Sequence, residues 1–205
     1  FINIGGIINS TTISNNQIIS ASDHGPGMCL IDEWIRKKMN KRFDTDGNIA
    51  KTGRINKIIL DQALDNFFNN ENYDNQSKNK NKSFDTKDFN FSFIRGLSIE
   101  DGAATLTEFS AQIIKDIIDS KLNTYNKAKV YLCGGGRKNN FLIDSVREKN
   151  QNIKQIDELG IDGDYVESQA FAYIAIRSFL ELEITFPETT GCKIPCSGGV
   201  LTNNY

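Results

Sequence analysis

Residues 128–156 decide the fold class of this chain, and their sequence is AKVYLCGGGRKNNFLIDSVREKNQNIKQI. The apolar run 128–133 predicts a buried strand, residues 137–149 predict a helix, and residues 152–156 predict a second strand. A strand–helix–strand unit of this length implies two parallel strands joined by a right-handed crossover. The sequence therefore predicts the α/β class.

Residues 1–22 give a different signal, because they are rich in β-branched side chains and contain an Asn15-Asn16 pair typical of a hairpin turn. Antiparallel strands there, beside the parallel pair, would make the sheet mixed. Flanking helices are expected at residues 26–40, 58–68, 98–122 and 164–182, and Ser98 is the expected N-cap of the third. The last of these is almost wholly apolar, so we expect it to be buried.

The totals exclude several classes of protein. The 205 residues have a net charge of −2 and no basic stripe, which argues against a nucleic acid as partner. Every apolar run is far shorter than the roughly 20 residues of a membrane span, so no membrane segment is expected. The four scattered cysteines favour free thiols in the reducing cytoplasm over a zinc site.

The sequence also indicates a part of a longer protein, because Phe1 lies inside a strand-like run. We therefore expect residues 1–205 to form one lobe. Within it, residues 69–88 are polar and poor in apolar anchors, which predicts a mobile surface insert.

Two glycine-rich stretches are candidate nucleotide sites. After Asn3, the pair Gly5 and Gly6 would let backbone N–H groups approach an anion, although a hairpin bulge is the simpler alternative. The second stretch consists of Gly134, Gly135, Gly136 and Asn139. It would open a slot for a flat ring or a phosphate near a helix N-terminus. It also nearly matches a dinucleotide fingerprint, with Asp157 near the position of a ribose-binding acid.

Asp23 is the candidate general base. It ends a strand-like run and precedes the rigid turn Gly25-Pro26-Gly27, which would hold a carboxylate in one place above a phosphate-transfer cleft. Turn chemistry alone also explains an aspartate at this point. His24 is the only histidine of the chain, so it forms neither a catalytic triad nor a metal site by itself.

Glu167 is a further candidate, in the first turn of the last helix. The structural alternative is a capping box, because Asp164 and Glu167 have its spacing. Asp32 and Glu33 are expected to be solvated or to pair along their helix. Residue patterns alone thus predict an α/β domain with two glycine loops suited to an anion or nucleotide, and a poised Asp23.

Stretches along nearly the whole chain resemble, in the correct order, the C-terminal lobe of bacterial anhydro-N-acetylmuramic acid kinases. They are FINIGGIIN (1–9), DHGPGMCLIDEWI (23–35), DTDGNIAKTGRI (44–55), ATLTEFSAQII (104–114), VYLCGGGRKNNFL (130–142), LGIDGDYVESQAFAYIA (159–175) and PETTGC (187–192). The resemblance implies one lobe of a sugar-kinase/actin (ribonuclease H-like) fold, with a mixed, five-stranded type of sheet flanked by helices.

The activity implied by the resemblance combines two steps. Water opens the 1,6-anhydro ring of 1,6-anhydro-N-acetylmuramic acid, and O6 takes the γ-phosphoryl group of ATP, giving N-acetylmuramic acid 6-phosphate in peptidoglycan recycling. Mg²⁺ would bridge the phosphates. The implied partners are ATP, the amino sugar and the missing N-terminal lobe, with a homodimer as a further option.

The resemblance also assigns roles to residues. The family's base falls on Asp23, and a position facing the substrate falls on Glu167, with Gly25 and Gly27 beside it. The implied ATP contacts are Asn3, Gly5, Gly6, Gly134, Gly135, Gly136 and Asn139. The chain departs from the family pattern at His24 and Met28, where Thr and Asn are usual. It also has no Gly-Thr-Ser-x-Asp-Gly motif, so we expect the fragment alone to be inactive.

Three other interpretations stay open at this stage. A kinase for a different sugar would keep the glycine loops but has no need of Asp23. A non-catalytic lobe that binds a nucleotide or a partner is favoured by the changes at His24 and Met28. A dinucleotide-dependent oxidoreductase is the most distant, because Asn139 stands where its fingerprint has a third glycine.

Overall fold

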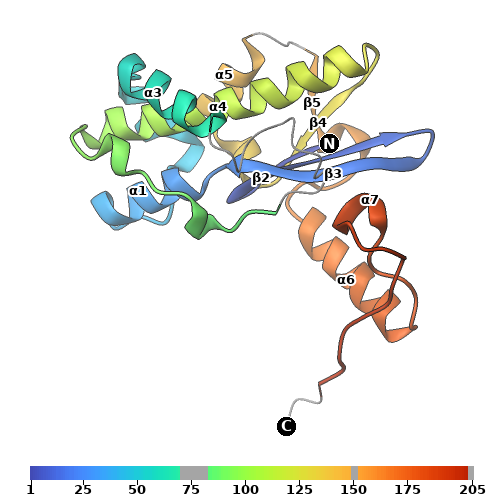
Figure 1. The fold of residues 1–205 in the computed structure, drawn as a ribbon. Coiled ribbons are helices and arrows are strands. Elements are labelled where there is room, and N and C mark those ends of the chain that lie inside the picture. Colours follow the sequence, from blue (N-terminus) through green and yellow to red (C-terminus); the bar gives the residue numbers. More distant parts are fainter. Residues whose placement is uncertain (70–82, 149–151, 203–205) are drawn as a thin grey trace.

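The computed structural model describes residues 1–69, 83–148 and 152–202, and it confirms the predicted α/β class (Figure 1). Five strands form one mixed sheet in the order β3-β2-β1-β4-β5. They are β1 (Ile2–Ile4), β2 (Ile7–Ser14), β3 (Gln17–Pro26), β4 (Val130–Cys133) and β5 (Ile153–Gln155). Because β1 and β4 are parallel neighbours, the segments that follow them lie at the same edge of the sheet.

β2 and β3 form the antiparallel hairpin that the sequence predicts. Asn15 and Asn16 have positive φ angles of 52° and 59°, as the two central residues of a type I′ turn require. A bulge lies opposite Ile8 and Asn9, and the extra residue of β3 comes directly after Asp23. Bulges change the direction of nearby side chains, so this one helps to set where Asp23 points.

The predicted parallel pair is formed by β4 and β5, and β1 also pairs with β4 in parallel, which the sequence did not predict. The crossover from β4 to β5 contains α5 (Asn140–Arg147), which is preceded by a 3₁₀ turn at Gly135–Lys138. The helix expected over residues 137–149 therefore begins later. Asn139 is its N-cap, and Asn139 Oδ1 accepts a hydrogen bond from Leu142 N at 3.0 Å.

Four α-helices of the described residues precede β4, and α4 is central among them. They are α1 (Cys29–Met39), α2 (Asn48–Thr52), α3 (Lys57–Phe68) and α4 (Ile99–Thr124). α4 contacts α1, α2, α3 and α5, and in Figure 1 it lies above the sheet beside α3 and α5. Ser98 caps α4 as predicted, and Trp34 on α1 is buried with its Nε1 donating to the Ile99 carbonyl at 2.9 Å.

The prediction that the last apolar helix is buried is wrong. This helix, α6 (Val166–Phe179), has no buried residue, and Phe171 on it is 70% exposed. α6 and the short α7 (Pro187–Thr190) lie below the sheet in Figure 1, away from the other helices. The apolar pattern found the helix correctly, but none of its residues is buried by the part of the chain that the structure describes.

Residues 70–82, which form most of the insert predicted at 69–88, lie outside the described residues. Residues 83–88, the described end of the predicted insert, are folded and bonded to β3. Phe84 N donates to Asp23 Oδ2 at 2.9 Å, and Asp85 caps a 3₁₀ turn at Thr86–Asp88. Residues 83–88 therefore belong to the surroundings of the candidate base, which their polar composition did not predict.

Candidate functional site

The two glycine stretches meet, because the strands before them are parallel neighbours. A Cβ on Gly134 would lie 2.3 Å from Asn3 Oδ1, and a Cβ on Gly136 would lie 2.3 Å from Ile4 Cγ2. The loop after β4 thus packs directly against the end of β1. At these two positions the separation is too short for a Cβ atom, so only glycine fits. Gly135, by contrast, has no neighbour within 4 Å of an added Cβ. The loop therefore has a packed side and an open side.

The turn after β3 closes on the turn after β1. Met28 N donates to the Gly5 carbonyl at 2.8 Å, and Gly27 N donates to the Gly6 carbonyl at 2.9 Å. A Cβ on Gly27 would lie 2.4 Å from the Gly5 carbonyl oxygen, and a Cβ on Gly25 would lie 2.5 Å from a core phenylalanine ring. Close packing accounts for both glycines of this turn. Their contact with a substrate stays a prediction.

Glu167 reaches the first glycine turn from α6. Its Oε1 accepts a hydrogen bond from Asn3 Nδ2 at 3.3 Å. The capping-box alternative is not formed, since the N-cap of α6 is Tyr165 without a side-chain cap bond, and Asp164 binds Arg137 instead. The structure thus brings together Asn3, Glu167 and the two glycine loops, which are distant in sequence.

Asp23 lies in a separate cavity of about 370 Å³, between β2, β3 and α7. Its walls include Asn9, Ser83 and Thr189, and the backbone N–H of Phe84 holds the carboxylate. The cavity that contains Gly5, Gly6 and Asn139 does not include Asp23. The proposed base and the proposed nucleotide loops therefore belong to two cavities of this chain.

His24 lies beside the candidate base but makes a contact within the sheet. Its Nε2 is 2.7 Å from the hydroxyl oxygen of Ser10 on β2. The ring thus pairs with a neighbouring strand, at the position where the family pattern has Thr.

Comparison with known proteins supports the resemblance seen in the sequence. The family model described as "Anhydro-N-acetylmuramic acid kinase" matches residues 1–204. The chain belongs to this family. A protein of Pelagibacter ubique named anhydro-N-acetylmuramic acid kinase is 46% identical over 211 residues, which cover 100% of this chain and 55% of that protein.

Two further relatives carry the same name. One from Brucella canis is 36% identical over 205 residues, and one from Rhizobium etli is 37% identical over 205 residues. Each match covers 98% of this chain and 52% of the relative. The chain thus spans about half the length of these relatives. The anhydro-N-acetylmuramic acid kinase family has a sugar-kinase/actin-like fold, and the mixed five-stranded sheet agrees with it.

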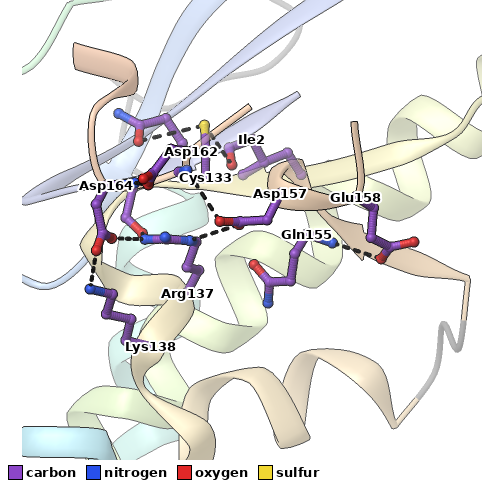
Figure 2. A network of polar contacts seen from close by, with 12 residues as sticks. Ile2, Cys133, Arg137, Lys138, Gln155, Asp157, Glu158, Asp162 and Asp164 are labelled. Carbon is purple, nitrogen blue, oxygen red and sulfur yellow. Dashed lines mark hydrogen bonds and ion pairs between the residues drawn. The ribbon is translucent and has the colours of Figure 1, made fainter. Parts of the chain in front are cut away.

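Figure 2 shows the ion pairs that anchor the segment leading to α6 in this member of the kinase family. Arg137 lies between two carboxylates, with Nε 3.3 Å from Asp157 Oδ2 and Nη1 2.7 Å from Asp164 Oδ1. Lys138 binds the second oxygen of Asp164 at 2.6 Å and, together with Arg137, lowers the pKa of that carboxyl. The hydrogen bond that Gly163 N donates to Asp157 has the largest part in lowering the pKa of this carboxyl, and the hydrogen bond from Arg137 lowers it further. The carboxylate of Asp157 is therefore occupied by its contacts with Arg137 and Gly163.

Asp32 lines the cavity at the glycine loops, and its sequence context did not make it a candidate. Of the two acids expected to be solvated or paired, only Glu33 follows the expectation, with Lys37 Nζ at 2.6 Å. Asp32 Oδ1 is buried and has no hydrogen-bond partner among the described residues. Burial raises the pKa of Asp32 to about 6; the positive charge of Arg36 opposes this rise, and the nearby Asp44 carboxylate adds to it. The available signal was a carboxylate inside the apolar run of residues 30–35.

Among the described residues, neither the cysteines nor the side chains that could bind a metal ion form a further site. All four cysteines are free, and burial raises the pKa of Cys29 to about 11, so this thiol is neutral at ordinary pH. In residues 1–69, 83–148 and 152–202, no group of three or more His, Cys, Asp or Glu side chains could hold a metal ion. Nor is any helix in these ranges both long and apolar enough to cross a membrane.

Proposed function

We propose that this chain is the C-terminal half of an ATP-dependent kinase acting on 1,6-anhydro-N-acetylmuramic acid. The whole enzyme would open the anhydro ring and phosphorylate O6, giving N-acetylmuramic acid 6-phosphate for peptidoglycan recycling in the cytoplasm. The observation that carries this proposal is the hydrogen bond from Asn3 to Glu167 at 3.3 Å. It joins a carboxylate suited to sugar hydroxyls to the glycine turn suited to phosphates.

In the proposed mechanism Asp23 is the general base. Its carboxylate takes a proton from a water molecule, whose oxygen forms a bond to the anomeric carbon of the sugar. The bond from that carbon to O6 breaks, and O6 attacks the γ-phosphorus of ATP, releasing ADP. The hydrogen bond from Phe84 N to Asp23 Oδ2 supports this role, because it fixes the orientation of the carboxylate.

The nucleotide would lie along the two glycine loops. Backbone N–H groups of the Gly5-Gly6 turn, next to Asn3, would bind phosphate oxygens. The loop of Gly134–Gly136, with Asn139, would take the adenosine. Mg²⁺ would neutralise charge on the phosphates.

The other half of the enzyme would cover α6. The chain spans only 52% to 55% of three relatives, and α6 exposes large apolar residues such as Phe171 and Ile176. Helices that are apolar on all sides need a covering surface. A second copy of the chain in a homodimer is the alternative cover. Analytical ultracentrifugation of the chain, alone and joined to the N-terminal half, separates these two assignments.

The decisive experiment uses the complete polypeptide, with the N-terminal half restored. It is incubated with ATP, Mg²⁺ and 1,6-anhydro-N-acetylmuramic acid in ¹⁸O-labelled water, and the products are followed by mass spectrometry. We expect a 6-phosphate with ¹⁸O at the anomeric carbon. Asp23→Asn should lower the rate by about 100- to 10,000-fold, the usual range for a lost general base. The exposed Asp61→Asn is the matched control and should leave the rate unchanged.

Two other functions predict different results. A kinase for a different sugar would phosphorylate another substrate and leave the anhydro sugar intact. A non-catalytic lobe would bind ATP without forming any product, an outcome favoured by His24 and Met28 at positions where the family pattern has Thr and Asn. Unlabelled product, or equal rates for Asp23→Asn and Asp61→Asn, would remove Asp23 from the mechanism.

A further inference from the structure

The cavity at the glycine loops has a volume of about 310 Å³ and is built from four segments. The turn after β1, the start of α1, the segment before α2 and the loop after β4 each contribute to it. The residues that matter here are Gly5, Asp32, Phe43, Asp44, Gly135 and Asn139. If the chain binds ATP as proposed above, this cavity is the one that both glycine loops share.

Two residues that line this cavity each carry a buried polar atom with no hydrogen-bond partner among the described residues. The two atoms are Asp32 Oδ1, an acceptor, and Asn139 Nδ2, a donor. Asn139 is only 3% exposed, and its Oδ1 is occupied by Leu142 N, which fixes which end of the amide is the free donor. Native proteins rarely leave buried polar atoms unsatisfied, so the pair indicates a ligand with a donor and an acceptor.

Asp32 is distinct from the other acids around this cavity. Both oxygens of Asp44 accept backbone hydrogen bonds, from Ile49 N at 2.8 Å and Ala50 N at 2.9 Å, so that carboxylate is committed to α2. Asp32 Oδ1 is not committed, and burial raises the pKa of Asp32 to about 6. At neutral pH it is therefore mainly a desolvated carboxylate, which is a strong acceptor for an O–H or N–H group.

The charge of the cavity limits what can enter it. Asp32, Asp44 and Asp46 all line it, while the one lining lysine, Lys138, is 2.6 Å from Asp164. A phosphate is therefore disfavoured beside Asp32. The half-exposed ring of Phe43 at the same cavity offers an apolar face for a flat base. An uncharged, ring-containing group with hydrogen-bond donors fits these walls, and the nucleoside part of ATP is such a group.

We propose that Asp32 is a nucleoside-recognition residue, whose Oδ1 accepts a hydrogen bond from an O–H or N–H group of the nucleoside while Asn139 Nδ2 donates to it. This assignment rests on the proposed use of ATP and adds a residue to it. The donor is either a ribose hydroxyl or the amino group of the base, and the two are chemically separable.

The test is a titration of the chain with adenosine, followed by NMR chemical shifts of the backbone amides. Saturable shifts are expected around the β1 turn and the loop after β4. Asp32→Asn and Asp32→Ala should each weaken adenosine binding by about tenfold or more, the usual cost of a lost hydrogen bond to a charged group. Glu33→Gln is the matched control, because it removes the same charge from a neighbouring, partly exposed position outside the cavity and should bind as the unmodified chain does.

Two analogues of adenosine show which of its groups donates the hydrogen bond to Asp32. If it is a ribose hydroxyl, 2′-deoxyadenosine binds the unmodified chain about tenfold more weakly, and Asp32→Ala removes this difference. If it is the base amino group, inosine shows that behaviour instead. Thermal unfolding of each variant provides a second readout. Asp32→Asn should unfold no earlier than the unmodified chain, so that weaker binding cannot be ascribed to lost structure.

Two outcomes overturn the assignment: adenosine produces no saturable shifts at this cavity, or Asp32→Ala binds it as tightly as Glu33→Gln does. Neither outcome decides the proposed kinase function, which the product assay tests independently. If that assay yields the 6-phosphate while Asp32→Ala leaves the KM for ATP unchanged, the kinase stands and the role of Asp32 fails. If adenosine binds through Asp32 but the product assay yields no sugar phosphate, the role of Asp32 stands and the proposed kinase function fails.

Discussion

α4 and α6 are both apolar helices of this chain, yet their surroundings are opposite. α4 packs against α1, α2, α3 and α5, and residues as different as Ile114 and Lys115 are buried on it. α6 has no buried residue at all. An apolar pattern thus shows that a helix needs to be covered, but it does not show whether the same chain supplies the cover.

The largest expected effect concerns the buried charge of α4. Lys115 Nζ lies 3.2 Å from Glu108 Oε1 and 2.8 Å from Ser145 Oγ, and both ionic side chains are nearly inaccessible. Lys115→Met would leave the Glu108 carboxylate buried without its cation, so the free energy of unfolding should fall by about 3–5 kcal/mol. Arg177→Met is the control on α6 and removes a surface contact with Glu183, so it should change this free energy by at most about 1 kcal/mol. Urea denaturation measures both, and equal losses would contradict the contrast between the helices.

A smaller effect is expected from an apolar pair on the same two helices. Ile114 is fully buried on α4, whereas Ile176 on α6 is 60% exposed. Ile114→Ala should lower the free energy of unfolding by about 3 kcal/mol through lost burial and a cavity, and Ile176→Ala by less than about 0.5 kcal/mol. In the complete polypeptide the cost of Ile176→Ala should rise if the missing half covers α6. An unchanged cost there would mean that the other half leaves this face exposed.

The smallest effect tests Asp32 through the pH dependence of stability. Its pKa rises from 3.8 to about 6 on folding, so between these values the folded state binds more protons and the free energy of unfolding falls as the pH increases. A shift of this size corresponds to at most about 3 kcal/mol, and partial exposure reduces it to about 1 kcal/mol. Asp32→Asn should therefore be about 1 kcal/mol more stable than the unmodified chain at pH 7.5.

The comparison at low pH completes this prediction. Near pH 4 the Asp32 carboxyl is protonated in the folded state, so the stability gained by Asp32→Asn should largely disappear. Chemical denaturation of the two proteins from pH 4 to 7.5 gives the difference directly, and effects of other titrating groups cancel in it. A constant difference across this range would show that Asp32 has an ordinary pKa.

Much of the fold could be predicted from the sequence, because its signals are local. The Asn15-Asn16 turn, the Ser98 cap and the parallel pair around residues 128–156 each depend on neighbouring residues and appear as expected. The helix over 137–149 began later than predicted, since Asn139 is its cap. The glycines were recognised as special for a local reason too, namely the missing side chain.

The site depended on contacts between distant segments. The parallel pairing of β1 and β4 places Gly134 against Asn3. The ion pairs of Arg137 hold the segment before α6, and Glu167 in the first turn of α6 reaches Asn3. Asp32 could be recognised only after folding, because its buried, uncommitted oxygen results from four segments closing around one cavity.

The sequence by itself determined the class, the Asn15-Asn16 turn, the Ser98 cap and the family of this chain, because each of these is encoded in short stretches or in their order. The tertiary structure alone decided which loops share a cavity, which acid is desolvated and which apolar helix stays exposed. The physical reason is that burial and hydrogen-bond satisfaction are properties of a whole packed surface, which distant segments of the chain build together.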